Sequence, residues 1–317
     1  MGRFDIVGSF ASSGGTMASI ATIRTWGEMI KFSHSVFALP FAMIATFLAG
    51  RRLDGGLPTG TQFALIILCM VAARSFAMTF NRIADAAIDA RNPRTAGRPI
   101  QTGRISVAQA SVFLVVSAAA FLAACSGFLV FCQNPWPLYL AGPTLIVLAA
   151  YSYAKRITAL THFILGATIA FAPMAAWIAI HPGSLGLSAL LLTGIVLLWI
   201  AGFDIIYACQ DMQVDRREGL YSIPAKIGVA RALVVSRICH AVTVALLIWL
   251  GIEAEFGWLY WGAVIATALL FAAEQSVVRP DDLSKVNLAF FTINGCISLL
   301  LGVAAICDLL LGLAPRP

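Results

Sequence analysis

Charged residues are scarce in this chain of 317 residues: only 11% are Asp, Glu, Lys or Arg, while 60% are hydrophobic and the mean hydropathy is +0.89. Soluble domains carry about 25% charged residues, so the composition excludes a soluble globular protein and indicates an integral membrane protein. The net charge of +6 comes from basic residues between the apolar segments. Membrane topology explains such charges, and no nucleic-acid partner is indicated.

Cysteine motifs for metals or disulfides are also missing. The seven cysteines lie in or beside apolar segments, without CxxC or Cys/His ligand spacing, and we interpret them as small packing residues. His162 has no ligand partner at metal spacing either. We interpret it as a hydrogen-bonded helix residue.

Apolar runs of the length that crosses a bilayer, about 20 residues, are abundant. They predict an all-α membrane protein with about nine transmembrane helices. The predicted segments are 28–50, 61–81, 107–131, 136–153, 161–180, 186–206, 229–251, 256–274 and 286–312. We expect residues 1–24 to form a flexible cytosolic tail and residues 25–317 to form a single transmembrane domain.

The entrance to the first segment mixes apolar and polar residues. Trp26, Met29 and Ile30 share a helical face, which predicts an interfacial helix over 25–34. Its expected role is anchoring. In an alternative interpretation, Lys31 and His34 contact a substrate at the membrane entrance.

Basic residues follow the second, fourth, sixth and eighth segments, and of the other loops only the first carries any. By the positive-inside rule, the loops after even-numbered helices face the cytoplasm, with the N-terminus inside and the C-terminus outside. We expect a multi-pass protein of the bacterial inner membrane. The basic residues concerned are Arg82, Arg91, Arg94, Arg98, Arg104, Lys155, Arg156, Arg216, Arg217, Lys226, Arg231, Arg279 and Lys285.

Two stripes of polar side chains lie at the predicted cytoplasmic ends of segments 61–81 and 186–206. Each recurs at steps of three or four residues, so its members share one helical face. Facing each other, the stripes would make an oxygen-rich cage suited to Mg²⁺ and a substrate's phosphates. The first stripe is Asn81, Asp85 and Asp89, and the second is Asp204, Tyr207, Asp211 and Asp215.

Basic residues surround these stripes. Arg91, Arg94 and Arg98 follow the first stripe directly, where guanidinium groups can fork onto diphosphate oxygens, although topology alone also explains arginines there. Arg74 lies two turns before Asn81 within an apolar segment. Because a charge in that position is costly, we expect it to face a polar cavity or a counter-charge.

The fourth segment ends in another basic pair. Lys155 and Arg156 are either stop-transfer charges or contacts to a substrate anion. In both halves of the chain, a DxxxD motif ends the second helix and Gly and Pro residues follow it. This pattern predicts that helices one to four and five to eight are two pseudo-repeated halves, with the ninth helix added. Such repeats place a site at their interface.

These motifs resemble the UbiA superfamily of intramembrane prenyltransferases, most closely its 4-hydroxybenzoate polyprenyltransferase branch. The motifs NRIADAAID, from Asn81 to Asp89, and DIIYACQDMQVD, from Asp204 to Asp215, carry the resemblance, together with TAGRPIQTGRIS and the Lys155-Arg156 pair. One departure is Arg82, because many members have Asp after the motif's Asn.

The resemblance implies nine helices around a central cavity, Mg²⁺ as cofactor and a polyprenyl diphosphate as donor. It implies that Asp85, Asp89, Asp211 and Asp215 are the catalytic, metal-holding residues, assisted by Asn81 and Asp204. The implied acceptor is an aromatic acid, 4-hydroxybenzoate or a related hydroxynaphthoate, in ubiquinone or menaquinone biosynthesis. For its carboxylate we expect a cation away from the 91–98 loop, Arg156 first and Arg74 second.

Two other classes share some of these features. A CDP-alcohol phosphatidyltransferase also uses aspartates and Mg²⁺ in a membrane, but its DGxxAR signature is absent from this sequence. A cation-coupled transporter would need carboxylates near the bilayer midplane, whereas the acids here gather at one membrane edge. Both readings are weaker than prenyl transfer.

Overall fold

The computed structural model of this chain describes residues 24–30 and 35–312. Most of the predicted tail, and the predicted roles of Lys31 and His34, lie outside these residues. The described part is helical and contains no β-sheet, only one isolated bridge between Arg279 and Asp282. The predicted all-α fold is therefore confirmed.

Most of the helices begin and end within a few residues of the predicted apolar segments, but α2 begins at Ser35, where the prediction placed residue 28. A short helix over 24–30 matches the predicted interfacial helix. The long helices are α2 (Ser35–Gly50), α3 (Gly60–Ala84), α5 (Val107–Cys132), α6 (Trp136–Ala150), α7 (Thr161–Ile180), α8 (Leu187–Ala208), α11 (Val229–Glu253), α12 (Trp258–Val277) and α13 (Asn294–Leu311). A π-helical turn, η5 (Leu288–Ile293), leads into α13.

Seven helices in the described residues are long and apolar enough to cross a membrane, so the predicted count of nine is not confirmed. Helix α2 has only 16 residues. Helix α12 is not among the seven either, because polar residues such as Glu274 and Gln275 lower its hydropathy.

Local signals explain where the long helices begin and end. Thr59 and Ser106 form capping boxes with Gln62 and Gln109 at the starts of α3 and α5, which satisfies backbone N–H groups that have no helical partner. Between α5 and α6, Gln133 adopts a left-handed conformation, with φ of 55°. That residue ends α5 and separates two helices joined by a very short connection.

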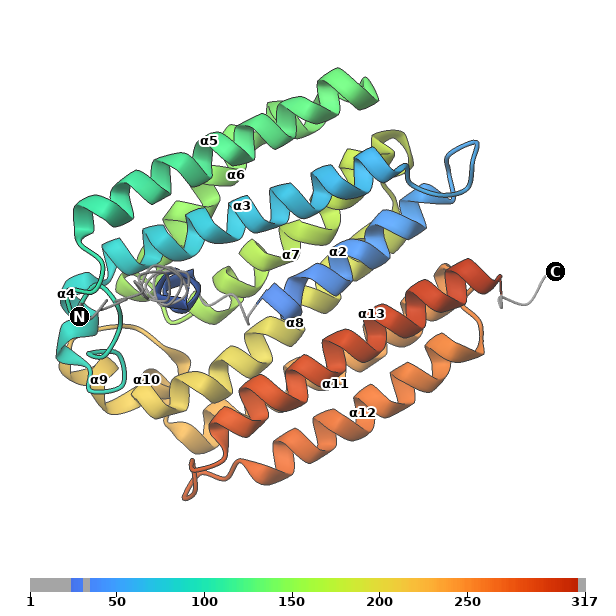
Figure 1. Ribbon diagram of the computed structural model, residues 1–317. Helices are drawn as coiled ribbons and strands as arrows, with labels where there is room; N and C mark the ends of the chain where they lie inside the picture. The colour runs from blue at the N-terminus through green and yellow to red at the C-terminus, as the bar shows by residue number, and fades with distance from the viewer. Residues whose placement is uncertain (1–23, 31–34, 313–317) are drawn as a thin grey trace, which may run out of the picture.

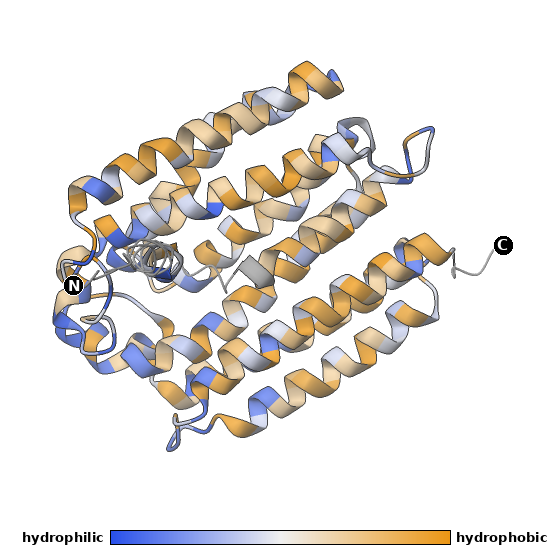
Figure 2. Ribbon diagram, viewed as in Figure 1, coloured by the Kyte–Doolittle hydropathy of each residue, from blue (hydrophilic) through white to orange (hydrophobic). Residues whose placement is uncertain are grey.

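The long helices run side by side in one bundle (Figure 1), with α8 packed against α7 and α11, α3 against α5, and α2 against α7 and α13. The connections after α3, α8 and α12 lie at one end of the bundle, while the α2–α3 connection lies at the other. Hydrophilic residues gather at the first of these ends, and the helices between are mostly hydrophobic (Figure 2). Both predicted stripes therefore belong to one end of the bundle.

Helix α8 supplies the centre of the core. Trp199 is fully buried and packs against Phe37, Phe41 and Phe203. Its indole N–H donates a 2.6 Å hydrogen bond to Asn294, which in turn donates one of 2.7 Å to Glu274. These bonds tie α8, α12 and α13 together, so Asn294 is the interhelical link expected of a buried amide.

Candidate active site

Each polar stripe runs through a break in its helix. We predicted continuous helices, but α3 ends at Ala84 and the short α4 (Ala86–Arg91) follows, while α8 ends at Ala208 and is followed by η4 (Cys209–Asp211) and α9 (Met212–Arg217). The breaks fall at equivalent aspartates: Asp85 has φ −96° and ψ 4°, and Asp211 has φ −96° and ψ −1°. This shared conformation supports the predicted repeat.

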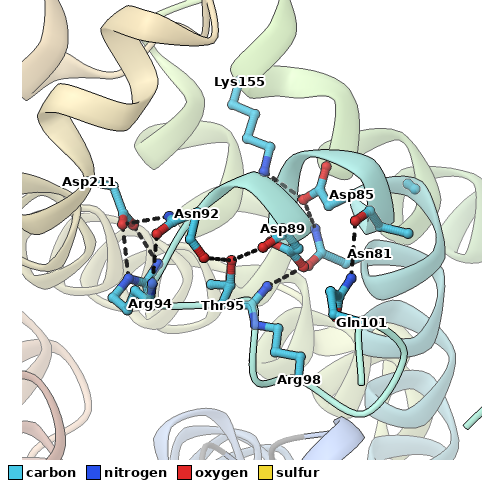
Figure 3. A network of polar contacts seen from close by, with 12 residues as sticks. Asn81, Asp85, Asp89, Asn92, Arg94, Thr95, Arg98, Gln101, Lys155 and Asp211 are labelled. Carbon is cyan, nitrogen blue, oxygen red and sulfur yellow. Dashed lines mark hydrogen bonds and ion pairs between the residues drawn. The ribbon is translucent and has the colours of Figure 1, made fainter. Parts of the chain in front are cut away.

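Asp85 is the centre of the first polar cluster (Figure 3). Its carboxylate accepts hydrogen bonds from Lys155 Nζ at 2.6 Å and Asn81 Nδ2 at 3.1 Å. Arg156 Nη2 donates a further hydrogen bond to it at 3.0 Å. The carboxylate is almost completely buried, with 3% of its side chain exposed. Two cations therefore contact one buried carboxylate and offset the cost of burying its charge.

Asp89 lies one turn further along and faces the loop that follows α4. Its carboxylate forms an ion pair with Arg98, and its main-chain carbonyl accepts a 2.8 Å hydrogen bond from Thr95 Oγ1. Gln101 reaches back to the carbonyl of Ala86 at 3.1 Å. These contacts fold the 92–101 loop over the first stripe.

Asp211 links the two halves of the chain. Arg94 binds it through two guanidinium nitrogens, with Nε 2.9 Å from Oδ1, and Asn92 Nδ2 donates to the same oxygen at 3.0 Å. Arg94 also donates to the Tyr207 hydroxyl at 2.8 Å. Burial lowers the pKa of Arg94, but its hydrogen bonds and ion pair with Asp211 outweigh that effect and raise it. The guanidinium therefore stays charged.

Asp204 and Asp215, in contrast, are held without Lys or Arg. Asp204 lies 2.7 Å from His162 Nδ1, and His162 Nε2 accepts a hydrogen bond of 3.3 Å from the backbone N–H of Ile223. Since Nε2 accepts, Nδ1 carries the proton and donates to Asp204. Asp215 accepts a 2.7 Å hydrogen bond from Ser222 Oγ. The expectation that His162 is hydrogen-bonded within the protein is confirmed.

Both stripes open into one cavity of about 450 Å³. Its polar end is lined by all five aspartates of the stripes and by basic side chains. Away from that end, the walls are apolar or aromatic and come from α3, α5, α6, α7 and α8, with Ile66, Phe121, Phe128, Leu140, Ile169 and Phe203 among them. The arrangement can bind a molecule with an anionic head and a long apolar tail.

The donor atoms at the polar end are carboxylate and amide oxygens, the ligand type that Mg²⁺ prefers. In residues 24–30 and 35–312, no three Asp, Glu, His or Cys side chains converge on a single point as a metal site. The carboxylates are instead turned onto Arg94, Arg98, Lys155 and Ser222. The residues present fit Mg²⁺ in type, and binding it requires these partners to move.

The cavity includes most of the residues that the sequence singled out. Lining it are Asn81, Arg74, Arg94, Arg98, Lys155, Asp204, Tyr207 and the four predicted metal-holding aspartates, Asp85, Asp89, Asp211 and Asp215. Two predicted residues are not among its lining. Arg156 is turned onto Asp85 and the carbonyl of Ala84, and Arg91 forms an exposed ion pair with Glu218 at 2.5 Å.

Asn92, Ser222 and Ser152 line the cavity and were not predicted. Asn92 and Ser222 bind the second stripe directly. Asn92 precedes a proline and Ser222 caps helix α10 (Ile223–Ile227), so their sequence context suggested loop structure only. The hydrogen bond from Arg91 lowers the pKa of Glu218, which keeps that ion pair charged and joins the loops after the two stripes.

Residues 38–296 match the model of the UbiA prenyltransferase family. The chain belongs to this family. Among curated members, it is 30% identical over 238 residues to a 4-hydroxybenzoate octaprenyltransferase of Serratia proteamaculans, covering 75% of this chain and 78% of that one. It is 31% identical over 251 residues to the enzyme of that name in Aliivibrio fischeri, covering 79% and 84%.

Solved UbiA structures share the fold. A UbiA homolog from Aeropyrum pernix is 30% identical, has a TM-score of 0.76, and aligns over 87% of this chain and 98% of its own. One from Archaeoglobus fulgidus, bound to GPP and Mg²⁺, is 20% identical with a TM-score of 0.69, over 90% and 99%. This UbiA member is therefore an integral membrane prenyltransferase. The phosphatidyltransferase and transporter readings are set aside.

Proposed function

We propose that this enzyme transfers a polyprenyl group from a polyprenyl diphosphate to a ring carbon of an aromatic acid, in a reaction that depends on Mg²⁺. The acceptor we propose is 4-hydroxybenzoate or a related hydroxynaphthoate, used in ubiquinone or menaquinone biosynthesis. The observation that carries the proposal is the cavity, in which two aspartate stripes and their basic partners close one end of an apolar chamber. The names of the curated relatives support the acceptor class.

The diphosphate binds, on this proposal, between the two stripes. Arg94, Arg98 and Lys155 each neutralise an aspartate in the structure and can turn from it to a phosphate oxygen, with Asn81 and Tyr207 beside them. Charge-assisted contacts of this kind stabilise the negative charge that develops on the departing diphosphate. Arg91 is placed to assist from the loop after the first stripe.

Asp85, Asp89, Asp211 and Asp215 are the residues that would hold Mg²⁺, with Asp204 and Asn81 assisting. The bound metal supplies positive charge that stabilises the leaving diphosphate. The carboxylates orient that charge, and His162, which contacts both Asp204 and the backbone N–H of Ile223, fixes the second stripe against the start of α10. Outer hydrogen bonds of this kind set the orientation of metal ligands.

The apolar walls hold the isoprenoid tail and keep water from the allylic cation that forms when the carbon–oxygen bond breaks. An electron-rich ring carbon of the acceptor then supplies the electron pair of the new carbon–carbon bond. The proton on that carbon leaves, and aromaticity returns. We propose that this site faces the cytoplasm, as the basic loops at its end of the bundle indicate.

The proposal is tested with membranes that contain the protein, Mg²⁺, a polyprenyl diphosphate and a panel of aromatic acids and neutral phenols. Mass spectrometry of the lipid extract identifies the product, which we expect to be a prenylated aromatic acid formed only with Mg²⁺. Product formation in EDTA would contradict the metal requirement. Prenylation of neutral rings alone would contradict the acceptor class.

A further inference from the structure

Arg237 is a charged residue on the outer face of the bundle. It lies in α11, which is long and apolar enough to cross a membrane, and its side chain is exposed. Val234, Ala241 and Ile248, at positions i−3, i+4 and i+11 relative to Arg237, share its side of the helix and are exposed as well. An exposed apolar side of a membrane-spanning helix faces lipid. Arg237 therefore faces the bilayer, in contrast to the arginines that line the cavity.

Nothing in the described part of the chain neutralises Arg237. Its side chain forms no ion pair or hydrogen bond with residues 24–30 or 35–312. The one acidic residue of α11, Glu253, is at the far end of the helix, about 24 Å away along the axis. An arginine within a membrane-spanning segment is costly, and it almost always faces the protein interior or a partner. An outward-facing arginine therefore calls for a partner from outside the described residues.

The position of Arg237 along the bundle places it near lipid headgroups. Gln275 Nε2, on α12, donates a 2.9 Å hydrogen bond to Ser236 Oγ, and α12 ends two residues later at Val277. Arg237 follows Ser236, so it lies level with the last turn of α12, at the polar end of the bundle (Figure 1). Spanning helices end at about the depth where hydrocarbon gives way to headgroups. The apolar stem of an arginine can carry its guanidinium to that depth.

We infer that Arg237 binds the phosphate group of an anionic phospholipid, in the leaflet at the polar end of the bundle. A planar guanidinium binds two phosphate oxygens through parallel hydrogen bonds. The acyl chains of the same lipid lie along Ala241 and Ile248, which continue the exposed apolar side of α11 toward the bilayer centre. The lipid thus supplies both the counter-charge that the chain lacks and an apolar partner for the helix below it. This surface lies outside the cavity and goes beyond the proposed function.

A second copy of the chain fits this surface less well. In a two-fold symmetric dimer the same patch meets itself, so the Arg237 side chains of the two copies would approach and repel each other. Arg231 adds a further positive charge near the same end of α11. The connection after α12 adds no net charge, because its two basic and two acidic residues balance: Arg279, Asp281, Asp282 and Lys285. A phospholipid, in contrast, brings negative charge and apolar chains together, as this surface requires.

Native mass spectrometry of the purified full-length protein in detergent measures this binding. The variants are Arg237→Leu, Arg237→Gln and Arg237→Lys, and the matched control is Arg104→Gln, an exposed arginine already paired with Glu28. The probes are dioleoyl phosphatidylglycerol, which is anionic, dioleoyl phosphatidylcholine, which is zwitterionic, and inorganic phosphate. Wild type should bind phosphatidylglycerol more tightly than phosphatidylcholine. The dissociation constant for phosphatidylglycerol should rise about fivefold in the two neutral variants, as expected for one arginine lost beside an anionic lipid, and stay near wild type in Arg104→Gln.

Thermal unfolding gives an independent readout of the same contact. Phosphatidylglycerol should raise the unfolding midpoint of wild type above its value in phosphatidylcholine, and should raise that of Arg237→Leu less, because a ligand stabilises the state that binds it. Arg237→Lys should give values between the two, since it keeps the charge but not the planar fork. Prenyl transfer in detergent without added lipid should be equal in wild type and Arg237→Leu, because Arg237 is not among the cavity's lining residues. The proposed function is therefore tested separately.

Several outcomes overturn the inference. Equal affinity for phosphatidylglycerol in wild type and the neutral variants would show that Arg237 does not bind it, and equal affinity of wild type for the two lipids would show that no anionic headgroup is selected. Inorganic phosphate that binds wild type but not Arg237→Leu, without any preference between the lipids, would indicate a simple anion site. A dimer of lipid-free wild type that is lost in Arg237→Leu would assign the surface to a second copy. Arg237→Gln keeps the test decisive if Arg237→Leu does not fold.

Discussion

The two aspartate stripes are alike in sequence and differ in what holds them. In the first stripe, Asp85 and Asp89 are both ion-paired with Lys or Arg. In the second, only Asp211 is paired with arginine, while Asp204 contacts His162 and Asp215 contacts a serine hydroxyl. Lysine and arginine side chains thus neutralise most of the negative charge of the first stripe, whereas they neutralise only one of the three aspartates of the second stripe.

This difference bears on how a divalent cation would enter. At the first stripe, a metal must displace an ammonium or guanidinium group from a buried carboxylate. At Asp215, a neutral hydrogen bond can persist on one oxygen while the other binds the metal. We therefore expect the second stripe to bind metal more readily, and the first to join when the basic side chains turn to the diphosphate.

The largest effect is expected from removing a carboxylate of either stripe. Asp85→Asn and Asp211→Asn should each lower kcat/KM about hundred- to thousandfold. Each variant removes a negative charge that would hold the Mg²⁺ needed to stabilise the leaving diphosphate. The measurement is steady-state prenyl transfer in membranes with matched protein levels. Asp54→Asn, at an exposed residue of the α2–α3 connection, is the control for loss of an acidic charge. Full activity in either stripe variant would show that the two stripes do not act together.

Much of this site could be predicted because the periodicity of a helix is a strong constraint. Stepping by four from Asn81 to Asp89 places three polar groups on one helical face. At the end of an apolar membrane segment, such groups are expected to face a polar cavity inside the protein and not the lipid. The bounds of α5 and α7 follow from apolar length in the same way. The sequence pattern therefore predicted the fold and the cavity residues on the stripes.

The pairing of individual charges could not be predicted, because it depends on where loops fold back. Arg94 crosses from the first half to Asp211 of the second, a contact between residues far apart in the chain. Arg156, which we expect at the acceptor, forms an ion pair with Asp85 in the structure. Ser222 carries a helix-cap signal that gave no hint of its contact with Asp215. Side chains with many rotamers make such contacts only once the tertiary fold positions them.

The next effect concerns the cation that occupies the first stripe. In Lys155→Met, the 2.6 Å contact with Asp85 is lost, and a metal no longer competes with the ammonium group. Metal affinity should increase about tenfold, and the donor's KM should rise by a similar factor, as expected for loss of a charge-assisted contact. Titration with Mn²⁺ followed by EPR measures the first, and steady-state kinetics the second. Lys226→Met, at an exposed residue of α10, is the control for charge. Metal affinity equal to wild type would mean that Lys155 does not compete with the metal for Asp85.

The smallest effect should come from the neutral partner of the second stripe, and its sign should be opposite. Ser222 donates a 2.7 Å hydrogen bond to Asp215 and also accepts from Ala225 N–H at 3.3 Å, which caps α10. Because the hydroxyl orients the carboxylate without neutralising it, Ser222→Ala should weaken metal binding about two- to tenfold, the range of one neutral hydrogen bond. Ser222→Thr keeps the hydroxyl for both contacts and should bind Mn²⁺ like wild type in the same EPR titration. If Ser222→Ala tightened binding as Lys155→Met is expected to, the serine would be a competitor for Asp215, and the two stripes would differ only in degree.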